Sequence, residues 1–134
     1  MRTALIIATL AVTFCGNASA ATRLSVGTRV QPVDIVLSDF AFTPQNLRLH
    51  HGQVYQLRLM NRGSGAHNLA APEFFAAAQI NPGDGAAVSG GRIEVGKGET
   101  RTVTLTPVAA GRYGMTCTHF LHASFGMTGS ITVD

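Results

Sequence analysis

Apolar and polar residues alternate with a period of two in several short segments, and this pattern constrains the fold more than any other feature. Successive side chains of a β-strand point to opposite faces, so the alternation is typical of strands with one buried face. It occurs at residues 33–38, 46–50, 55–60, 102–106 and 130–133. Glycines separate these segments as turns. Many short strands at such spacing predict an all-β sandwich or barrel.

Residues 72–78 break the alternation. The segment begins with Pro72 and Glu73 and ends in a run of alanines. Proline and an acidic residue in a first turn favour a helix, so we expect one short helical insertion here. Residues 81–91 are rich in glycine and alanine, and we expect them to form a mobile loop. The sequence contains no internal repeat and predicts a single folded domain.

The first twenty residues have the pattern of a cleaved signal peptide. Arg2 precedes an apolar run at residues 4–15, and Ala18-Ser19-Ala20 provides the small residues of a cleavage site. We therefore expect residues 1–20 to direct export to the periplasm and residues 21–134 to form the mature domain. No later segment reaches eighteen consecutive apolar residues, so no membrane span is predicted.

The charged residues of the predicted mature domain are few and scattered. Of the ten Lys and Arg residues, all but Arg2 lie in this domain, where seven Asp and Glu residues oppose them. They form no basic run, so nucleic-acid binding is not predicted. The domain retains one cysteine, Cys117. Because exported proteins normally use cysteines in pairs, a lone thiol is either buried and inert or bound to a metal.

The segment that contains this cysteine carries the chemistry. Tyr113, Met115 and Cys117 share one face of a predicted strand, which directs the thiol inward. His122 and Met127 follow in the spacing Cys-x4-His-x4-Met. One thiolate, one imidazole and one thioether on a single loop indicate a blue copper centre, which also needs a second imidazole.

His67, within Gly-Ala-His-Asn at residues 65–68, is expected to supply the second imidazole from the other sheet. Other roles exist for these residues, because a lone cysteine is often a small buried hydrophobe and methionine often fills gaps in a core. Cys117, His122 and Asn68 are also the residue types of a thiol protease. The nucleophile and the base would lie five residues apart on one loop, and no protease motif appears, so we predict no enzyme.

Three further histidines have alternative roles. His119 would share the face of Cys117 if the strand continued, and it could replace His122, join the copper ligands or lie at the surface. His50 and His51 are neighbours that would point to opposite faces of a strand. We expect them to be exposed before a turn, although they could form an auxiliary metal site.

Residues 33–134 resemble the cupredoxins, the family of plastocyanin, azurin and rusticyanin. The resemblance rests on Asp-Phe-Ala-Phe-Thr-Pro at residues 39–44, on Gly-Ala-His-Asn at residues 65–68, and on Cys-x4-His-x4-Met before the last predicted strand. It implies a Greek-key β-sandwich that binds one type 1 copper ion. The ligands that it implies are His67, Cys117, His122 and Met127.

The resemblance also implies roles for residues around the ligands. Asn68 would tie the two ligand loops together by hydrogen bonds, and the carbonyl of Ala66 would lie near the metal as a weak axial oxygen. The chain departs from many relatives at Phe120-Leu121, where they have Pro-Gly, and in its insertion at residues 71–91.

The function implied by the resemblance is transport of single electrons through Cu(I)/Cu(II) cycling in the periplasm. His122 would offer an exposed ring edge, and Phe120, Leu121 and Phe125 would form an apolar docking patch for a redox partner protein. The alternative is sequestration or delivery of copper in copper tolerance, with a copper-handling protein as partner. We expect a monomer in either case.

Overall fold

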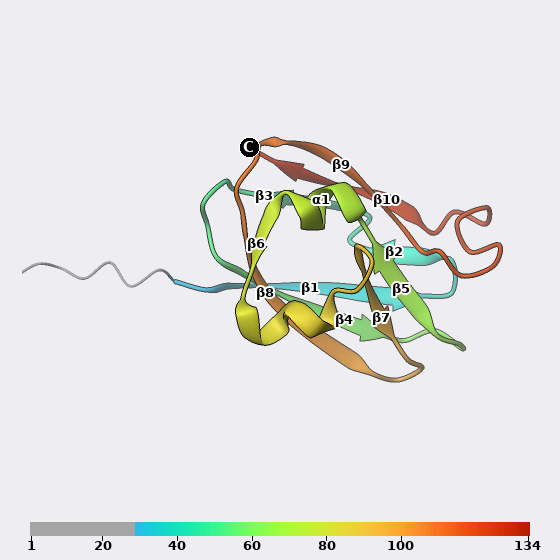
Figure 1. Cartoon of the computed structure of the whole chain (residues 1–134). Coiled ribbons are helices and arrows are strands. Elements are labelled where there is room, and N and C mark those ends of the chain that lie inside the picture. Colours follow the sequence, from blue (N-terminus) through green and yellow to red (C-terminus); the bar gives the residue numbers. More distant parts are fainter. Residues whose placement is uncertain (1–28) are drawn as a thin grey trace, which may run out of the picture.

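Two five-stranded β-sheets pack face to face in the computed structural model, which describes residues 29–134 (Figure 1). The predicted signal peptide at residues 1–20 lies outside the described residues. Within residues 29–134, no helix has both the length and the apolar character needed to cross a membrane.

The strands follow one another across the sheets in a non-sequential order. The first sheet has the order β2 (Ala41–Thr43), β1 (Gln31–Ser38), β4 (Tyr55–Asn61), β8 (Thr100–Pro107), β6 (Ala78–Ile80). The second sheet has the order β3 (Asn46–Leu49), β10 (Thr128–Val133), β9 (Gly111–Thr116), β5 (His67–Ala70), β7 (Arg92–Val95). β1 pairs with β4 and β3 with β10 in parallel, whereas the other pairs are antiparallel. The predicted all-β Greek-key sandwich is confirmed.

The alternating residues of the sequence line the space between the sheets. Ile35 of β1, Leu57 and Leu59 of β4 and Val103 of β8 are fully buried, whereas Arg58 between the two leucines is exposed. Each buried side chain of this size stabilises the fold by roughly 1.5–3 kcal/mol relative to an exposed one. The period of two therefore predicted these three strands and the face that each one buries.

The predicted short helical insertion is present. Helix α1 (Pro72–Ala76) has five residues and anchors itself through the buried rings of Phe74 and Phe75. The Phe74 ring packs edge to face on Tyr113 of β9, with 5.6 Å between the ring centroids. The chain then forms β6, which extends the first sheet. Three residues are too few to show a period of two, so the sequence did not reveal this strand.

The segment expected to be a mobile loop contains a 3-10 helix, η1 (Pro82–Ala87). The Asn81 side chain accepts a hydrogen bond from the N–H of Gly83 at 3.0 Å and so caps the start of η1. The Asp84 carboxylate accepts one from the N–H of Thr104 in β8 at 2.9 Å. The second of these bonds attaches the segment to the first sheet, so the segment has more structure than its composition predicted.

Two glycines on paired strands of the second sheet give a matched test of the packing. A Cβ at Gly129 of β10 would overlap the carbonyl oxygen of Gln45 and would lie 2.6 Å from Cε of Met115, whereas a Cβ at Gly114 of β9 would meet nothing within 4 Å. Gly129→Ala is therefore expected to lower the free energy of unfolding by about 1–3 kcal/mol.

Gly114→Ala is the control and is expected to be neutral or stabilising by up to about 1 kcal/mol. Urea denaturation of both metal-free variants and the wild type measures the effect. Equal stability of the two variants would contradict the close approach of β10 to Gln45.

Candidate metal centre

His67 and Cys117 lie on neighbouring strands of the second sheet. His67 is the first residue of β5, and Cys117 directly follows β9, which pairs with β5 through Ala70 and Thr116. The expectation that His67 comes from the other sheet is therefore wrong. The chain crosses from the first sheet to the second between Asn61 and His67, before the histidine rather than after it.

The loop that carries the other candidate donors is closed at its base by backbone hydrogen bonds. The N–H of Cys117 donates to the carbonyl of Met127 at 3.1 Å, and the N–H of Met127 donates to the carbonyl of His122 at 3.0 Å. Leu121 has a φ of 63°, in the left-handed region that L-residues seldom adopt. The chain therefore reverses sharply just before His122 and returns the imidazole toward Cys117.

The donor atoms of His67, Cys117 and His122 converge. The two Nδ1 atoms are 3.1 Å apart, Sγ of Cys117 lies 3.3 Å from Nδ1 of His122, and the three donor atoms all lie within 4.8 Å of one another. In zinc sites, nitrogen and sulfur ligands lie about 2.0–2.3 Å from the ion. The separations between these three donor atoms therefore suit one shared ion of similar size. A thiolate with two imidazoles is the strong donor set of a single type 1 copper ion.

Burial differs among the three donors in a way that suits this chemistry. Cys117 is fully buried, His67 is 1% exposed, and His122 is partly exposed. The N–H of Asn68 points at Sγ of Cys117 from 3.5 Å. Loss of hydration is the main cause that lowers the pKa of His122, and repulsion from His67 and His119 adds to it, so the neutral imidazole is favoured. A neutral imidazole presents the lone pair that a metal needs.

Comparison with known proteins decides the family. A family model described as a cupredoxin-like domain matches residues 4–133. The chain belongs to the cupredoxin family. No curated protein sequence matches it.

Solved structures with the same fold include small blue copper proteins and parts of larger enzymes. A dithionite-reduced auracyanin from Roseiflexus castenholzii superposes with a TM-score of 0.57 at 20% identity, covering 78% of this chain and 97% of that one. Auracyanin A from Chloroflexus aurantiacus, described as a "blue" copper protein, gives 0.53 at 22% identity, covering 77% and 99%. A multicopper oxidase gives 0.58 at 14% identity, but this cupredoxin spans only 42% of it.

Asn68 joins the two segments of this cupredoxin that carry His67 and Cys117. Its side-chain oxygen accepts the N–H of Thr118 at 2.9 Å, and its amide donates to Oγ1 of Thr118 and to Glu94, each at 2.8 Å. The side chain thereby fixes the residue after Cys117 against the residue after His67. The predicted role of Asn68 is confirmed.

Asp39 is a residue of the site whose role the sequence analysis missed. Its Oδ1 lies 3.3 Å from Nε2 of His67 and accepts the N–H of Ser64 at 2.9 Å. The bond from the Ser64 backbone is the main cause that lowers the pKa of Asp39, so the carboxyl stays ionised. Asp39 lies in the segment of residues 39–44, which carries part of the family resemblance. A single carboxylate in the sequence gives no indication that it contacts His67.

The remaining candidates differ in how the structure places them. Met127 is fully buried at the base of the loop, and its thioether as an axial ligand stays a prediction, as does the carbonyl of Ala66. His119 lies outside the group of converging donors. Its Nε2 lies 3.0 Å from Glu94, and its ring stacks on His122 with 5.6 Å between centroids.

His50 and His51 are exposed just before the turn at Gly52, as predicted. Nδ1 of His50 pairs with Asp134 at 2.6 Å, and Nε2 of His51 lies 3.1 Å from the carbonyl of Val108. The two rings therefore have different partners and do not converge on a shared site.

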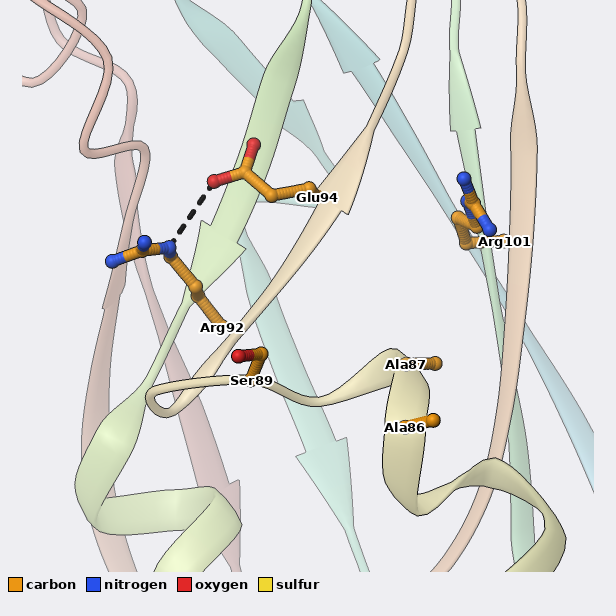
Figure 2. Close-up of a pocket in the computed structure, with 6 residues that line it drawn as sticks. All are labelled: Ala86, Ala87, Ser89, Arg92, Glu94 and Arg101. Atoms are coloured by element: carbon orange, nitrogen blue, oxygen red, sulfur yellow. Dashed lines mark ion pairs between the residues drawn. The ribbon is translucent and has the colours of Figure 1, made fainter.

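A cavity of about 260 Å³ is lined by Ala86, Ala87, Ser89, Arg92, Glu94 and Arg101 (Figure 2). Arg92 and Glu94 form an ion pair at 3.1 Å on its wall. None of the three donor residues lines this cavity, so it is separate from the metal centre.

Removal of each histidine tests the assignment of the donors. His67→Ala and His122→Ala each remove one strong donor, so Cu(II) affinity is expected to fall by more than the roughly 10–100-fold that loss of an outer partner costs. His119→Ala should change it by less than about 10-fold. Met127→Leu should retain copper, because an axial thioether binds weakly. Competition with a chelator of known affinity measures all four variants. A larger loss of Cu(II) affinity in His119→Ala than in His122→Ala would mean that His119, and not His122, is the imidazole donor of the loop.

Proposed function

We propose that this cupredoxin binds one copper ion through His67, Cys117 and His122, with Met127 as a weak axial ligand, and carries single electrons. The observation that supports this most is the convergence of three donor atoms at one point, with the sulfur fully buried and one imidazole reaching the surface. A buried sulfur protects the thiolate from oxidants, while a surface imidazole offers a short route for electrons.

Copper in such a site would supply a one-electron couple between Cu(I) and Cu(II). The residues of the chain hold their positions independently of that change. β5 and β9 fix His67 and Cys117 in one sheet, and the bonds between Cys117, His122 and Met127 close the loop. Asn68 ties the two segments together. Donors held in this way need little rearrangement when an electron arrives or leaves, and this property favours rapid transfer.

The surface around His122 supports the docking of a partner protein. We name as the apolar patch Phe120, Phe125, Leu121 and Phe40, which are 87%, 62%, 47% and 42% exposed. The ring of Phe40 lies edge to face on His122 with 5.4 Å between centroids. Exposed apolar clusters of this kind mark interaction sites. A redox protein that docks here would bring its own centre close to the imidazole.

Two further parts of the proposal rest on the sequence. The signal-peptide pattern of residues 1–20 and the single cysteine of the remaining chain support action in the periplasm. The chain corresponds to about two fifths of each multicopper oxidase of similar fold, and we do not transfer the activity of those enzymes to it. A chain of this length with a single copper site supports electron transport without catalysis.

Copper sequestration or delivery is the alternative function. The imidazole of His119, stacked on His122 beside the site, is the observation that favours it, because it could receive copper on the way in or out. The two functions differ in what the protein passes to its partner, an electron or a copper ion. An electron carrier retains its copper through repeated reduction, whereas a delivery protein releases Cu(I) to an acceptor.

Electron self-exchange between oxidised and reduced protein tests the electron-carrier function. Phe120→Ser removes the most exposed side chain of the apolar patch and is expected to slow self-exchange several-fold without changing the reduction potential, because Phe120 makes little packing contact. Val108→Ser is the control, since Val108 is also an exposed apolar residue (40%) but lies outside the patch. Line broadening in NMR spectra of mixed oxidation states gives the rate.

Loss of copper during a few cycles of reduction and oxidation would contradict the electron-carrier function and support delivery. Equal self-exchange rates in Phe120→Ser and Val108→Ser would contradict the role of the apolar patch in docking.

A further inference from the structure

The turn between β1 and β2 reaches the metal centre through Asp39. Figure 1 shows this turn at the same end of the sandwich as the loop of residues 117–127. Oδ1 of Asp39 lies 3.3 Å from Nε2 of His67 and is held there by the N–H of Ser64 at 2.9 Å. The Asp39 side chain is about half exposed (47%), but the His67 side chain is 1% exposed. The carboxylate is thus the polar partner that the structure shows for the outer nitrogen of a buried imidazole.

This contact determines which nitrogen of His67 carries the proton. An ionised carboxylate only accepts hydrogen bonds, so Nε2 must be the donor. In a neutral imidazole the other nitrogen then has a free lone pair. That nitrogen is Nδ1, which lies 3.1 Å from Nδ1 of His122 in the converging donor group. The carboxylate therefore selects the tautomer that a metal at this position requires.

Gly63 gives a second, independent sign that the Asp39–His67 contact is built into the fold. A Cβ at Gly63 would overlap Nε2 of His67 and would lie 2.7 Å from Oδ1 of Asp39. The N–H of Gly63 is fixed by the side chain of Asn61 at 2.9 Å, and Asn61 in turn holds the carbonyl of Gly65 at 2.8 Å. The backbone at Gly63 therefore lies against the hydrogen bond, where no larger residue fits.

We propose that Asp39 is a positioning residue of the copper centre, which fixes the Nε2–H tautomer of His67 and stabilises Cu(II) over Cu(I) through its negative charge. The second effect rests on the proposed function, because it requires copper among the donors. A carboxylate behind a metal-binding histidine fixes the ring and makes its inner nitrogen a stronger donor. A negative charge close to an ion also stabilises the higher positive charge of Cu(II) more than that of Cu(I).

The tautomer can be tested in the metal-free protein. ¹⁵N NMR of the imidazoles at pH 8 is expected to show His67 as the Nε2–H form in the wild type. Asp39→Ala removes the acceptor, and Gly63→Ala forces the two groups apart, so both variants should show a mixture of tautomers or the Nδ1–H form. The same tautomer in wild type and in both variants would overturn the first effect.

The charge effect is tested with Asp39→Asn, which retains an acceptor oxygen but removes the negative charge. Asp134→Asn is the matched control. Asp134 also contacts a histidine, His50, but it lies at the end of β10 that is far from the loop of residues 117–127. Asp39→Asn should lower Cu(II) affinity by about 10–100-fold and Cu(I) affinity by less. Each tenfold difference between these losses raises the reduction potential by about 59 mV.

Asp134→Asn should leave both affinities and the potential unchanged. A potential and a Cu(II) affinity that are the same in Asp39→Asn and in the wild type would overturn the charge effect. If the wild type itself binds no Cu(II), the proposed function fails, and the NMR measurement still decides whether Asp39 fixes the tautomer of His67.

Discussion

Two imidazole nitrogens and one thiol sulfur lie within 4.8 Å of one another at one end of the second sheet, and the electrostatics of this group constrain the rest of the site. Lone pairs that face one another at 3.1 Å repel unless a proton or a cation lies between them. Charges buried away from water must likewise be paired or bound to a metal. The fold brings these groups together, so either a shared proton or a bound cation must lie among them.

The scaffold supplies the rigidity that this arrangement needs. β5 and β9 are neighbours in the second sheet, and the buried side chains of the first sheet cover its inner face. His67 and Cys117 therefore share one rigid support. Asn68 fixes the residue that follows Cys117, and Asp39 fixes the outer edge of His67. His122 lies on the most exposed of the three supporting segments, and the ring of Phe40 packs against it. The donor with the greatest access to solvent is thus also the one closest to the apolar patch.

The sequence predicted those parts of the fold and site that repeat or that have fixed spacing. A period of two identified β1, β4, β8 and β10, and Cys-x4-His identified two donors, because both patterns are local. The contact between Asp39 and His67 joins residues 28 positions apart, and a single carboxylate carries no periodic signal. The sheet to which His67 belongs depends on where the chain crosses between sheets, which no local pattern specifies. β6 was too short to detect, and Phe40 lies in a turn, outside the patterns that mark strands.

The visible absorption spectrum during titration with Cu(II) tests the central claim most directly, because charge transfer from a thiolate to Cu(II) is intense and requires a direct bond between them. The account predicts a strong visible band that reaches its maximum at one equivalent of Cu(II) per chain and is absent from Cys117→Ser. A wild-type protein that binds Cu(II) without such a band, or a Cys117→Ser variant that retains it, would contradict the claim that Cys117, His67 and His122 form one copper centre.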